Sequence, residues 1–355
     1  MAKNQANSHF TEKRVKGDAV YNQKHLLHRK QKNHRTGRLR TVALDVTGLC
    51  NMRCGFCYAE PFKQATPIAD DIMVALLNEL HAMGVFHYVL QGGEAILDKS
   101  RLDLILKHCH PEESFLTLVT NGWQIDCETV QWLAERGLDK ICFSLDSGLV
   151  DEHDASRQAG SYQRVLEGLA RVKAAGLQAS LSTIVTHQSL YGPGFQALLS
   201  LAQSHRVRLE IQIAQPVGLW DGKRDMLIHE KDAAYIKALQ TQFPALANGQ
   251  QQVHRDLFCG ACDHCPAGAE FLSISVDGHV FPCNFLQFSF GRIDQRPIGE
   301  IYNDIIQVPW FQAREPQCPP GENSVFFDQY IAPFTDLRKP LAGHVFWSGK
   351  GVSVR

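Results

Sequence analysis

Between residues 40 and 216 the chain alternates short runs rich in β-branched and aromatic residues with longer runs that repeat apolar residues at helical spacing. This alternation is typical of repeated β-α units with a parallel sheet. The predicted strands are 40–47, 86–91, 115–120, 139–146, 178–186 and 208–215. The predicted helices between them are 70–83, 100–109, 127–136, 161–175 and 194–204. The pattern indicates an α/β fold, either an open doubly wound sheet or a partial barrel, with ligands bound where the strands end.

The pattern changes after residue 216, where turn residues become frequent and a single helix is predicted at 230–243. The stretch FLSISVDGHVFPC, 271–283, consists of two alternating runs joined by Asp277-Gly278, a dipeptide favoured in tight hairpin turns. The last residues are rich in Gly, Pro and aromatic side chains and are predicted to be irregular. We therefore expect five regions: a basic N-terminal arm 1–39, a core 40–216, a linker with a helix 217–258, a small cysteine-containing α+β domain 259–320 and a tail 321–355.

The composition is that of a globular protein, with 44% hydrophobic residues. Apolar runs are much shorter than the ~18 residues that suggest a membrane span, and the N-terminus lacks the apolar segment of an export signal. We therefore expect a cytoplasmic protein that does not bind membranes. Eleven cysteines in a cytoplasmic chain favour metal binding over disulfide bonds.

Residues 1–40 are strongly basic, with eleven Lys or Arg against Glu12 and Asp18. Such an arm could grip an acidic peptide, a nucleotide-bearing substrate or a nucleic acid. Alternatively, it is a solvated tail that folds back on the acidic remainder of the chain. The sequence assigns it no specific role.

Three cysteines, Cys50, Cys54 and Cys57, directly follow the first predicted strand. Structural zinc sites usually have four ligands, often in two C-x2-C pairs, so this trio with unequal gaps fits them poorly. Iron–sulfur clusters are also held mainly by cysteine thiolates. Three thiolates on a 4Fe-4S cluster would leave one iron open to a substrate or a cofactor.

The spacing C-x3-C-x2-C, with the aromatic Phe56 before the last cysteine, resembles the defining motif of the radical SAM enzymes. The resemblance implies that the open iron binds the amino and carboxylate groups of S-adenosylmethionine (SAM). Reductive cleavage of SAM would then give a 5'-deoxyadenosyl radical that abstracts a substrate hydrogen. The resemblance also implies a partial (β/α)6 TIM-type barrel over about residues 40–215. A reducing partner such as flavodoxin or ferredoxin would supply the electron.

The resemblance continues at the ends of the later strands. QGGEA is similar to the family's GGE motif, which binds the methionine amino group, although Ala95 replaces the usual proline. Polar residues follow where family members contact SAM, with Arg157 at the position of a contact to the carboxylate and Gln212 on the adenosine side. Several of these polar groups could equally satisfy the backbone at strand ends. The predicted cofactor-binding residues are Phe56, Gly92, Gly93, Glu94, Thr120, Ser144, Arg157 and Gln212.

A second cysteine group begins at residue 259. Without the first group, its spacing would favour a zinc ribbon or knuckle. Beside a radical SAM core it resembles the SPASM and Twitch extensions, in which a cysteine, a glycine such as Gly278 and a second cysteine such as Cys283 help to bind an auxiliary 4Fe-4S cluster. A full SPASM domain holds two such clusters, but too few cysteines follow for a second one. We predict one auxiliary cluster, with four ligands from Cys259, Cys262, Cys265, Cys283 and Cys318.

The choice among these five cysteines stays open. The family resemblance favours the set that contains Cys318 and omits Cys262, whereas local spacing favours the set that contains Cys262 and omits Cys318. An open auxiliary site is a third alternative. Three further cysteines are expected to be ordinary buried thiols: Cys109, Cys127 and Cys142.

These observations predict an enzyme that abstracts a hydrogen from a substrate lying between the barrel and its extension. Relatives with such extensions mostly modify peptides or proteins, and we expect this here. The alternative is oxidation, epimerisation or rearrangement of a small molecule of the aminosugar, nucleotide or tetrapyrrole type. A remote alternative is a non-catalytic zinc protein that binds nucleic acid through its basic arm, but the arm lacks interleaved aromatic residues. No acid or base residue is assigned.

Overall fold

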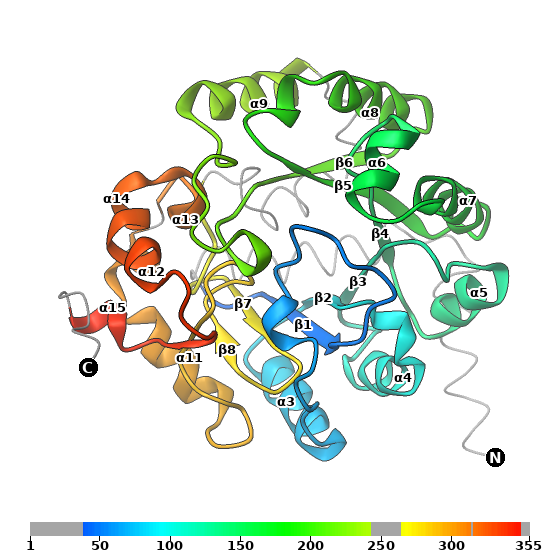
Figure 1. Ribbon diagram of the computed structural model, residues 1–355. Helices are drawn as coiled ribbons and strands as arrows, with labels where there is room; N and C mark the ends of the chain where they lie inside the picture. The colour runs from blue at the N-terminus through cyan, green and yellow to red at the C-terminus, as the bar shows by residue number, and fades with distance from the viewer. Residues whose placement is uncertain (1–37, 243–263, 314, 349–355) are drawn as a thin grey trace, which may run out of the picture.

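A computed structural model describes residues 38–242, 264–313 and 315–348 (Figure 1). Its main sheet has eight strands in the order β6-β5-β4-β3-β2-β1-β7-β8. The first six strands are β1 Thr41–Thr47, β2 His87–Gly92, β3 Phe115–Thr120, β4 Lys140–Ser144, β5 Gln178–Val185 and β6 Arg208–Ile213. Each is parallel to its neighbours among the six. This consecutive order excludes a doubly wound sheet, in which the order reverses at a switch point, and confirms the partial (β/α)6 barrel.

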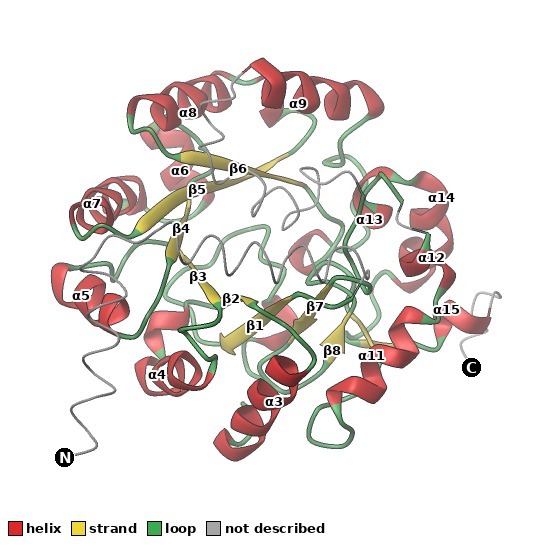
Figure 2. Cartoon of the chain, turned by 180° about the vertical axis from the view of Figure 1, so that it is seen from behind, coloured by secondary structure: helices red, strands yellow, loops and turns green. Residues whose placement is uncertain are grey.

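The helices surround the strands, as Figure 2 shows from behind. Those of the barrel are α3 Asp70–Ala82, α4 Lys99–His108, α5 Cys127–Glu135, α6 Val150–Ser156, α7 Ser161–Ala174 and α8 Pro193–Ser204, followed by α9 Glu230–Gln242. The observed ends lie within two residues of the expected ones, except for α6, which was not expected. Its sequence VDEHDAS has no apolar repeat to reveal a helix. Short 3-10 turns complete this part: η1 Glu60–Phe62, η2 Ala95–Leu97, η3 Ser189–Tyr191 and η4 Gly218–Trp220.

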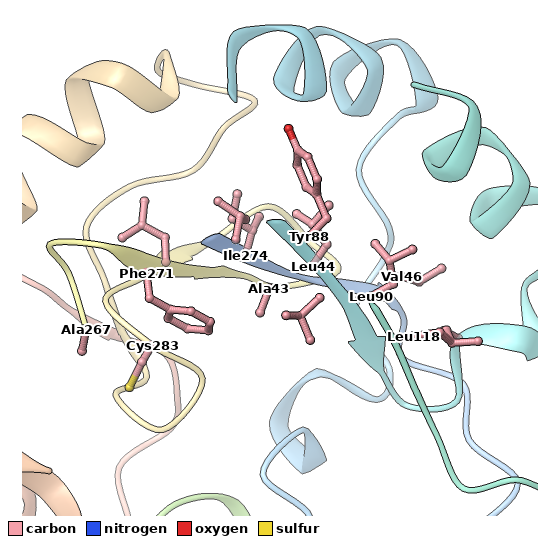
Figure 3. Packing of buried hydrophobic residues seen from close by; sticks show 14 of the residues in the cluster. Ala43, Leu44, Val46, Tyr88, Leu90, Leu118, Ala267, Phe271, Ile274 and Cys283 are labelled. Carbon is pink, nitrogen blue, oxygen red and sulfur yellow. The ribbon is translucent and has the colours of Figure 1, made fainter. Parts of the chain in front are cut away.

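The sheet is covered on both faces, and β1 is buried at all seven positions. Successive side chains of a strand point to opposite faces. Figure 3 shows the result, with Tyr88 and Ile274 directed toward the outer helices and Phe271 on the inner face with Cys283. The hydrophobic core includes side chains of both faces, and inner-face residues such as Phe271 and Cys283 also line the cavity described below.

The second cysteine region extends the barrel sheet. The expected hairpin is present as β7 Phe271–Ile274 and β8 Val280–Phe281, with Gly278 in its turn at a φ of 86°. Strand β7 also pairs in parallel with β1, from Thr41 opposite Phe271 to Leu44 opposite Ile274. The sequence did not predict this pairing, which makes the second region one continuous sheet with the first.

After the hairpin, the predicted α+β domain continues with β9 Phe288–Ser289, α11 Ile298–Ile306, α12 Pro309–Gln312 and, at its end, α13 Pro319–Glu322. The tail after residue 320 was expected to be irregular, but its described residues form α14 Ser324–Phe326, the π-helix η6 Phe327–Ile331, η7 Ala332–Phe334, β10 Leu341–Ala342 and α15 Val345–Ser348. Its aromatic side chains pack together, with the Phe326 and Tyr330 rings each close to Phe346. Burial of these rings stabilises turns that have little helical pattern.

Two of the three cysteines expected to be ordinary buried thiols, Cys109 and Cys142, are buried. Cys127 is exposed instead, because it is the first residue of α5, at the solvent-facing start of that helix. Among the residues that the structure describes, no helix is long and apolar enough to cross a membrane.

Candidate active site

The first cysteine group lies on the loop that follows β1. Cys50, Cys54 and Cys57 are all partly exposed and line one cavity on the inner face of the barrel. The Cys57 N–H donates to the Cys54 carbonyl at 3.2 Å, a tight turn that gathers the thiols. Burial raises the pKa of all three, while the positive charge of Arg157 acts in the opposite direction on Cys54. Three soft thiol donors on one cavity wall fit the thiolate ligation of an iron–sulfur cluster.

The paired glycines at the end of β2 let the cysteine loop approach the sheet. The Gly93 N–H donates to Thr47 O at 2.8 Å, and the Glu94 N–H donates to Leu49 O at 2.7 Å. A Cβ atom on Gly93 would lie only 2.1 Å from Leu49 O, and Gly92 has a φ of 123°. Larger residues at these positions would therefore push the cysteine loop away from the sheet.

Glu94 is held deep in the site. It is 1% exposed, and burial raises its pKa to about 7 although hydrogen bonds act in the opposite direction. The Thr120 hydroxyl donates to its Oε1 and the Asn121 N–H to its Oε2, both at 2.8 Å. This pair of donors fixes the carboxyl group from the end of the neighbouring strand β3. A bound amino group that donates a hydrogen bond to this carboxyl group would favour the carboxylate form.

Arg157 is the C-terminal cap of α6 and forms a bidentate ion pair with Asp146. Its Nε donates to Oδ2 at 2.5 Å, and its Nη2 donates to Oδ1 at 3.2 Å. Its guanidinium group lies 5.1 Å from the centre of the Phe56 ring, and that ring lies 5.6 Å from the Trp220 ring. The turn at Gly218 holds this aromatic contact in place, because the Leu219 N–H donates to Cys57 O at 3.2 Å. Asp146 and Trp220 are therefore parts of the site that the sequence did not reveal.

All eight predicted cofactor-binding residues line the cavity that the first three cysteines line: Phe56, Gly92, Gly93, Glu94, Thr120, Ser144, Arg157 and Gln212. They come from the loop after β1, the ends of β2, β3, β4 and β6, and the cap of α6. The carboxyl ends of parallel strands meet at one edge, which explains why residues so far apart in sequence share one cavity.

The second cysteine group borders the site. Cys283 lines the cavity. Burial raises its pKa, and the nearby Cys265 and Cys318 thiols raise it further, so the three thiols lie close enough to interact. Cys283 and Cys318 are each 3% exposed. Gln215, just after β6, donates to Cys318 Sγ at 3.5 Å and links this group to the barrel. Two predicted ligands, Cys259 and Cys262, lie outside the described residues.

A polar network joins the two parts of the site. Asp45 accepts hydrogen bonds from the Tyr58 hydroxyl at 3.0 Å and from Gln91 Nε2 at 3.2 Å. Asn284, next to Cys283, donates to Gln91 Oε1 at 3.4 Å. Burial raises the pKa of Asp45 to about 6. The sequence motifs did not reveal these residues, although Tyr58 directly follows the cysteine motif and Gln91 directly precedes the two glycines.

Comparison with known proteins agrees with this geometry. Residues 44–196 match the model of the radical SAM superfamily, and residues 265–320 match SPASM, an iron–sulfur cluster-binding domain. The two matches include the first cysteine group and the described part of the second. The observed β7-β1 pairing thus joins the two matched domains in one sheet.

Three similar proteins, two by sequence and one by structure, carry names or titles of different kinds. The AdoMet-dependent heme synthase of Nitratidesulfovibrio vulgaris is 23% identical over 313 residues, covering 79% of this chain and 84% of that protein. The PqqA peptide cyclase of Xanthomonas axonopodis pv. citri is 26% identical over 280 residues, covering 74% of each. The structure of Streptococcus suis SuiB bound to its precursor peptide SuiA superposes with a TM-score of 0.60 at 16% identity, covering 80% of this chain and 69% of that one.

Proposed function

Because this chain belongs to the radical SAM superfamily of enzymes and carries a SPASM domain, we propose that it modifies a side chain or the backbone of a peptide or protein. Its cofactors are SAM and 4Fe-4S clusters. The chemistry that they supply when bound is reductive cleavage of SAM and abstraction of a substrate hydrogen. A carrier such as flavodoxin or ferredoxin would supply the electron.

The first cysteine loop and the strand ends would hold the cofactors. Cys50, Cys54 and Cys57 would ligate the SAM-binding cluster. The Glu94 carboxyl group, held by Thr120, would accept a hydrogen bond from the SAM amino group.

Three further residues would position the rest of SAM: Arg157 for its carboxylate, with Ser144 and Gln212 on the walls of the cavity. The ion pair with Asp146 holds Arg157 in place, and Phe56 packs under its guanidinium group.

The observation that carries the proposal is that both matched domains line one cavity. Cys283, Asn284 and Phe285 follow the SPASM hairpin and face the same space as the first cysteine loop. A substrate in this space would touch both parts at once. Tyr58 and Gln91 offer polar groups to it, while Asp45, buried behind them, holds both in position.

The second cysteine group would hold one auxiliary 4Fe-4S cluster. Cys265, Cys283 and Cys318 supply three thiols, and Cys259 or Cys262 would supply the fourth ligand. Burial of Cys283 and Cys318 suits a closed site that excludes solvent, in contrast to the open first site.

Two relatives support a peptide substrate, since one is named a peptide cyclase and the other is solved with a precursor peptide. A second candidate is a small molecule of the tetrapyrrole, nucleotide or aminosugar type. The heme synthase favours it, because that relative aligns with more of this chain than the peptide cyclase does.

The decisive experiment is anaerobic reconstitution with iron and sulfide, followed by dithionite and SAM. We expect about eight irons per chain for two 4Fe-4S clusters, and release of 5'-deoxyadenosine. Absence of 5'-deoxyadenosine with full iron loading would overturn the enzymatic proposal.

The substrate class is tested with synthetic peptides encoded by short reading frames near the gene. A peptide substrate should change in mass and increase 5'-deoxyadenosine formation, and deuterium placed in the peptide should appear in 5'-deoxyadenosine. Transfer of deuterium from a tetrapyrrole or a nucleotide, with none from any peptide, would favour the second candidate.

A further inference from the structure

Two histidines and one aspartate converge outside the cavity described above. His187 lies two residues after β5, His229 directly precedes α9, and Asp232 is in the first turn of α9. Their nitrogen and oxygen atoms all lie within 4.8 Å of one another. None of the three lines the active-site cavity. The group therefore needs an explanation separate from the radical chemistry.

The distances suit a small metal ion after modest side-chain movement. His187 Nδ1 lies 2.8 Å from Asp232 Oδ2, and His229 Nδ1 lies 4.0 Å from the same oxygen. Two ligand atoms that each lie about 2.0–2.2 Å from a tetrahedral zinc ion are separated by a distance that falls between these two values. The histidine rings, with centroids 4.2 Å apart, are 42% and 65% exposed, so they can turn and water can reach a remaining coordination position.

The aspartate is already oriented as a ligand would need to be. Asp232 is 1% exposed, and its Oδ1 accepts a hydrogen bond of 2.8 Å from the Tyr191 hydroxyl. Its Oδ2 accepts a hydrogen bond of 2.7 Å from the His229 N–H. A fixed carboxylate beside two imidazoles is a typical donor set for zinc.

The surrounding contacts would give the metal a structural effect. Tyr191 stacks on Tyr235 of α9 with ring centroids 5.1 Å apart, and Gln196 of α8 donates to the Tyr235 hydroxyl at 3.2 Å. An ion bound by His187 on one side and by Asp232 on the other would join the loop after β5 to α9. That helix leads into the segment before the SPASM domain.

We propose that His187, His229 and Asp232 form a binding site for one divalent zinc-class ion, completed by water, that fastens α9 to the barrel. The Tyr191 hydroxyl acts as a positioning group for the carboxylate. The alternative is that Asp232 only caps α9 and bonds to His187, with no metal involved.

The test is equilibrium dialysis of the reconstituted, untagged full-length enzyme against buffered Zn²⁺ without oxygen. Zinc and iron are then counted together by mass spectrometry. We expect the His187→Gln/His229→Gln variant to bind one zinc fewer per chain than the wild type, with unchanged iron. Tyr191→Phe should weaken zinc binding by about 10–100-fold, the usual effect of losing a group that orients a metal ligand. Zinc should also raise the melting temperature of the wild type but not that of the double variant.

The matched control is His81→Gln/His110→Gln, which removes another pair of neighbouring histidines near an acidic residue, Glu113. This control should keep the zinc of the wild type. The proposal is overturned if the wild type and the His187/His229 variant bind equal zinc, or if the control loses as much. Because all chains share the same N-terminal histidines, zinc held there cancels in the comparison.

Discussion

The two cysteine groups differ in how the chain assembles them. Cys50, Cys54 and Cys57 lie on one short loop after β1, so their spacing in the sequence is also their spacing in the site. Cys283 and Cys318 come from separate segments, one after β8 and one at the start of α13. A local group can be identified from sequence, whereas an assembled group depends on the fold that collects it.

The groups also differ in burial. The first three thiols are partly exposed on an open cavity. In the second group Cys265 is also partly exposed, but Cys283 and Cys318 are almost completely buried. Burial raises the pKa of Cys283 well above that of a free thiol. An exposed group suits a cluster that must admit a cofactor, and a buried group suits one that is closed by protein ligands.

The largest expected difference is between Cys54→Ala and Cys283→Ala. The first should abolish 5'-deoxyadenosine formation, because it removes a proposed ligand of the SAM-binding cluster. The second should lower the iron content from about eight to about four per chain and leave SAM cleavage measurable. Iron analysis and chromatography of 5'-deoxyadenosine check both. Cys127→Ala, on the exposed start of α5, is the control and should behave as the wild type. Loss of all iron in Cys283→Ala would contradict the separation of the two groups.

The next largest effect concerns the close contact between the loop of the first cysteine group and the glycines at the end of β2. Gly93→Ala should destabilise the closed cysteine loop by about 1–3 kcal/mol, because the new Cβ would meet Leu49 O. Gly55→Ala, on the same loop, adds a Cβ with nothing within 4 Å and should be nearly neutral. Thermal unfolding and the yield of reconstituted cluster measure this contrast. If both variants lose equal stability and cluster yield, the contact between residue 93 and Leu49 O is not the cause of the loss.

A smaller effect concerns pH. The pKa of Glu94 is raised to about 7 in the cofactor-free protein. Protonated Glu94 therefore favours the fold, and its contribution to stability is lost as pH rises through about 7. The affinity for SAM depends on pH in the opposite direction, because in the proposed contact the SAM amino group donates a hydrogen bond to the Glu94 carboxylate.

SAM affinity should consequently fall by up to about tenfold per unit as pH drops below 7. Calorimetric titration of SAM into the reconstituted enzyme measures this affinity between pH 6 and pH 8, a range that brackets the Glu94 pKa of about 7. Glu94→Gln should bind SAM more weakly and without this slope. A wild-type affinity that is flat with pH would exclude Glu94 as the titrating contact.

The smallest effect is expected at the second group. Gln215→Leu removes the bond to Cys318, a contact of about 0.5–1.5 kcal/mol. It should shift the electron paramagnetic resonance signal of the auxiliary cluster and leave that of the SAM-binding cluster unchanged, so the first cluster serves as the internal control. A shift confined to the first cluster would mean that Gln215 acts on the other site.

The strands and most helices of the barrel could be predicted because their patterns are local. Parallel strands buried on both faces give strong apolar runs, and β3 was predicted at its observed bounds, Phe115–Thr120. By contrast, α6 has no apolar stripe, and the short helices after residue 323 pack through aromatic rings distant in sequence, such as Phe326 and Phe346. The contacts of Asp45 and Asp146 were missed for a similar reason, since each depends on a partner from another segment.

The sequence by itself determined the β-α repeat and the first cysteine group, because both depend on short-range spacing. The spacing of the cysteines also gave the family resemblance, and that resemblance, not the strand periodicity, predicted the barrel. Only the tertiary structure decided that β7 pairs with β1, which brings Cys283 and Asn284 to the cavity that contains Glu94 and Arg157. It also brought His187 to Asp232, 45 residues away. Strand pairing and burial of side chains join such segments, and neither depends on distance along the chain.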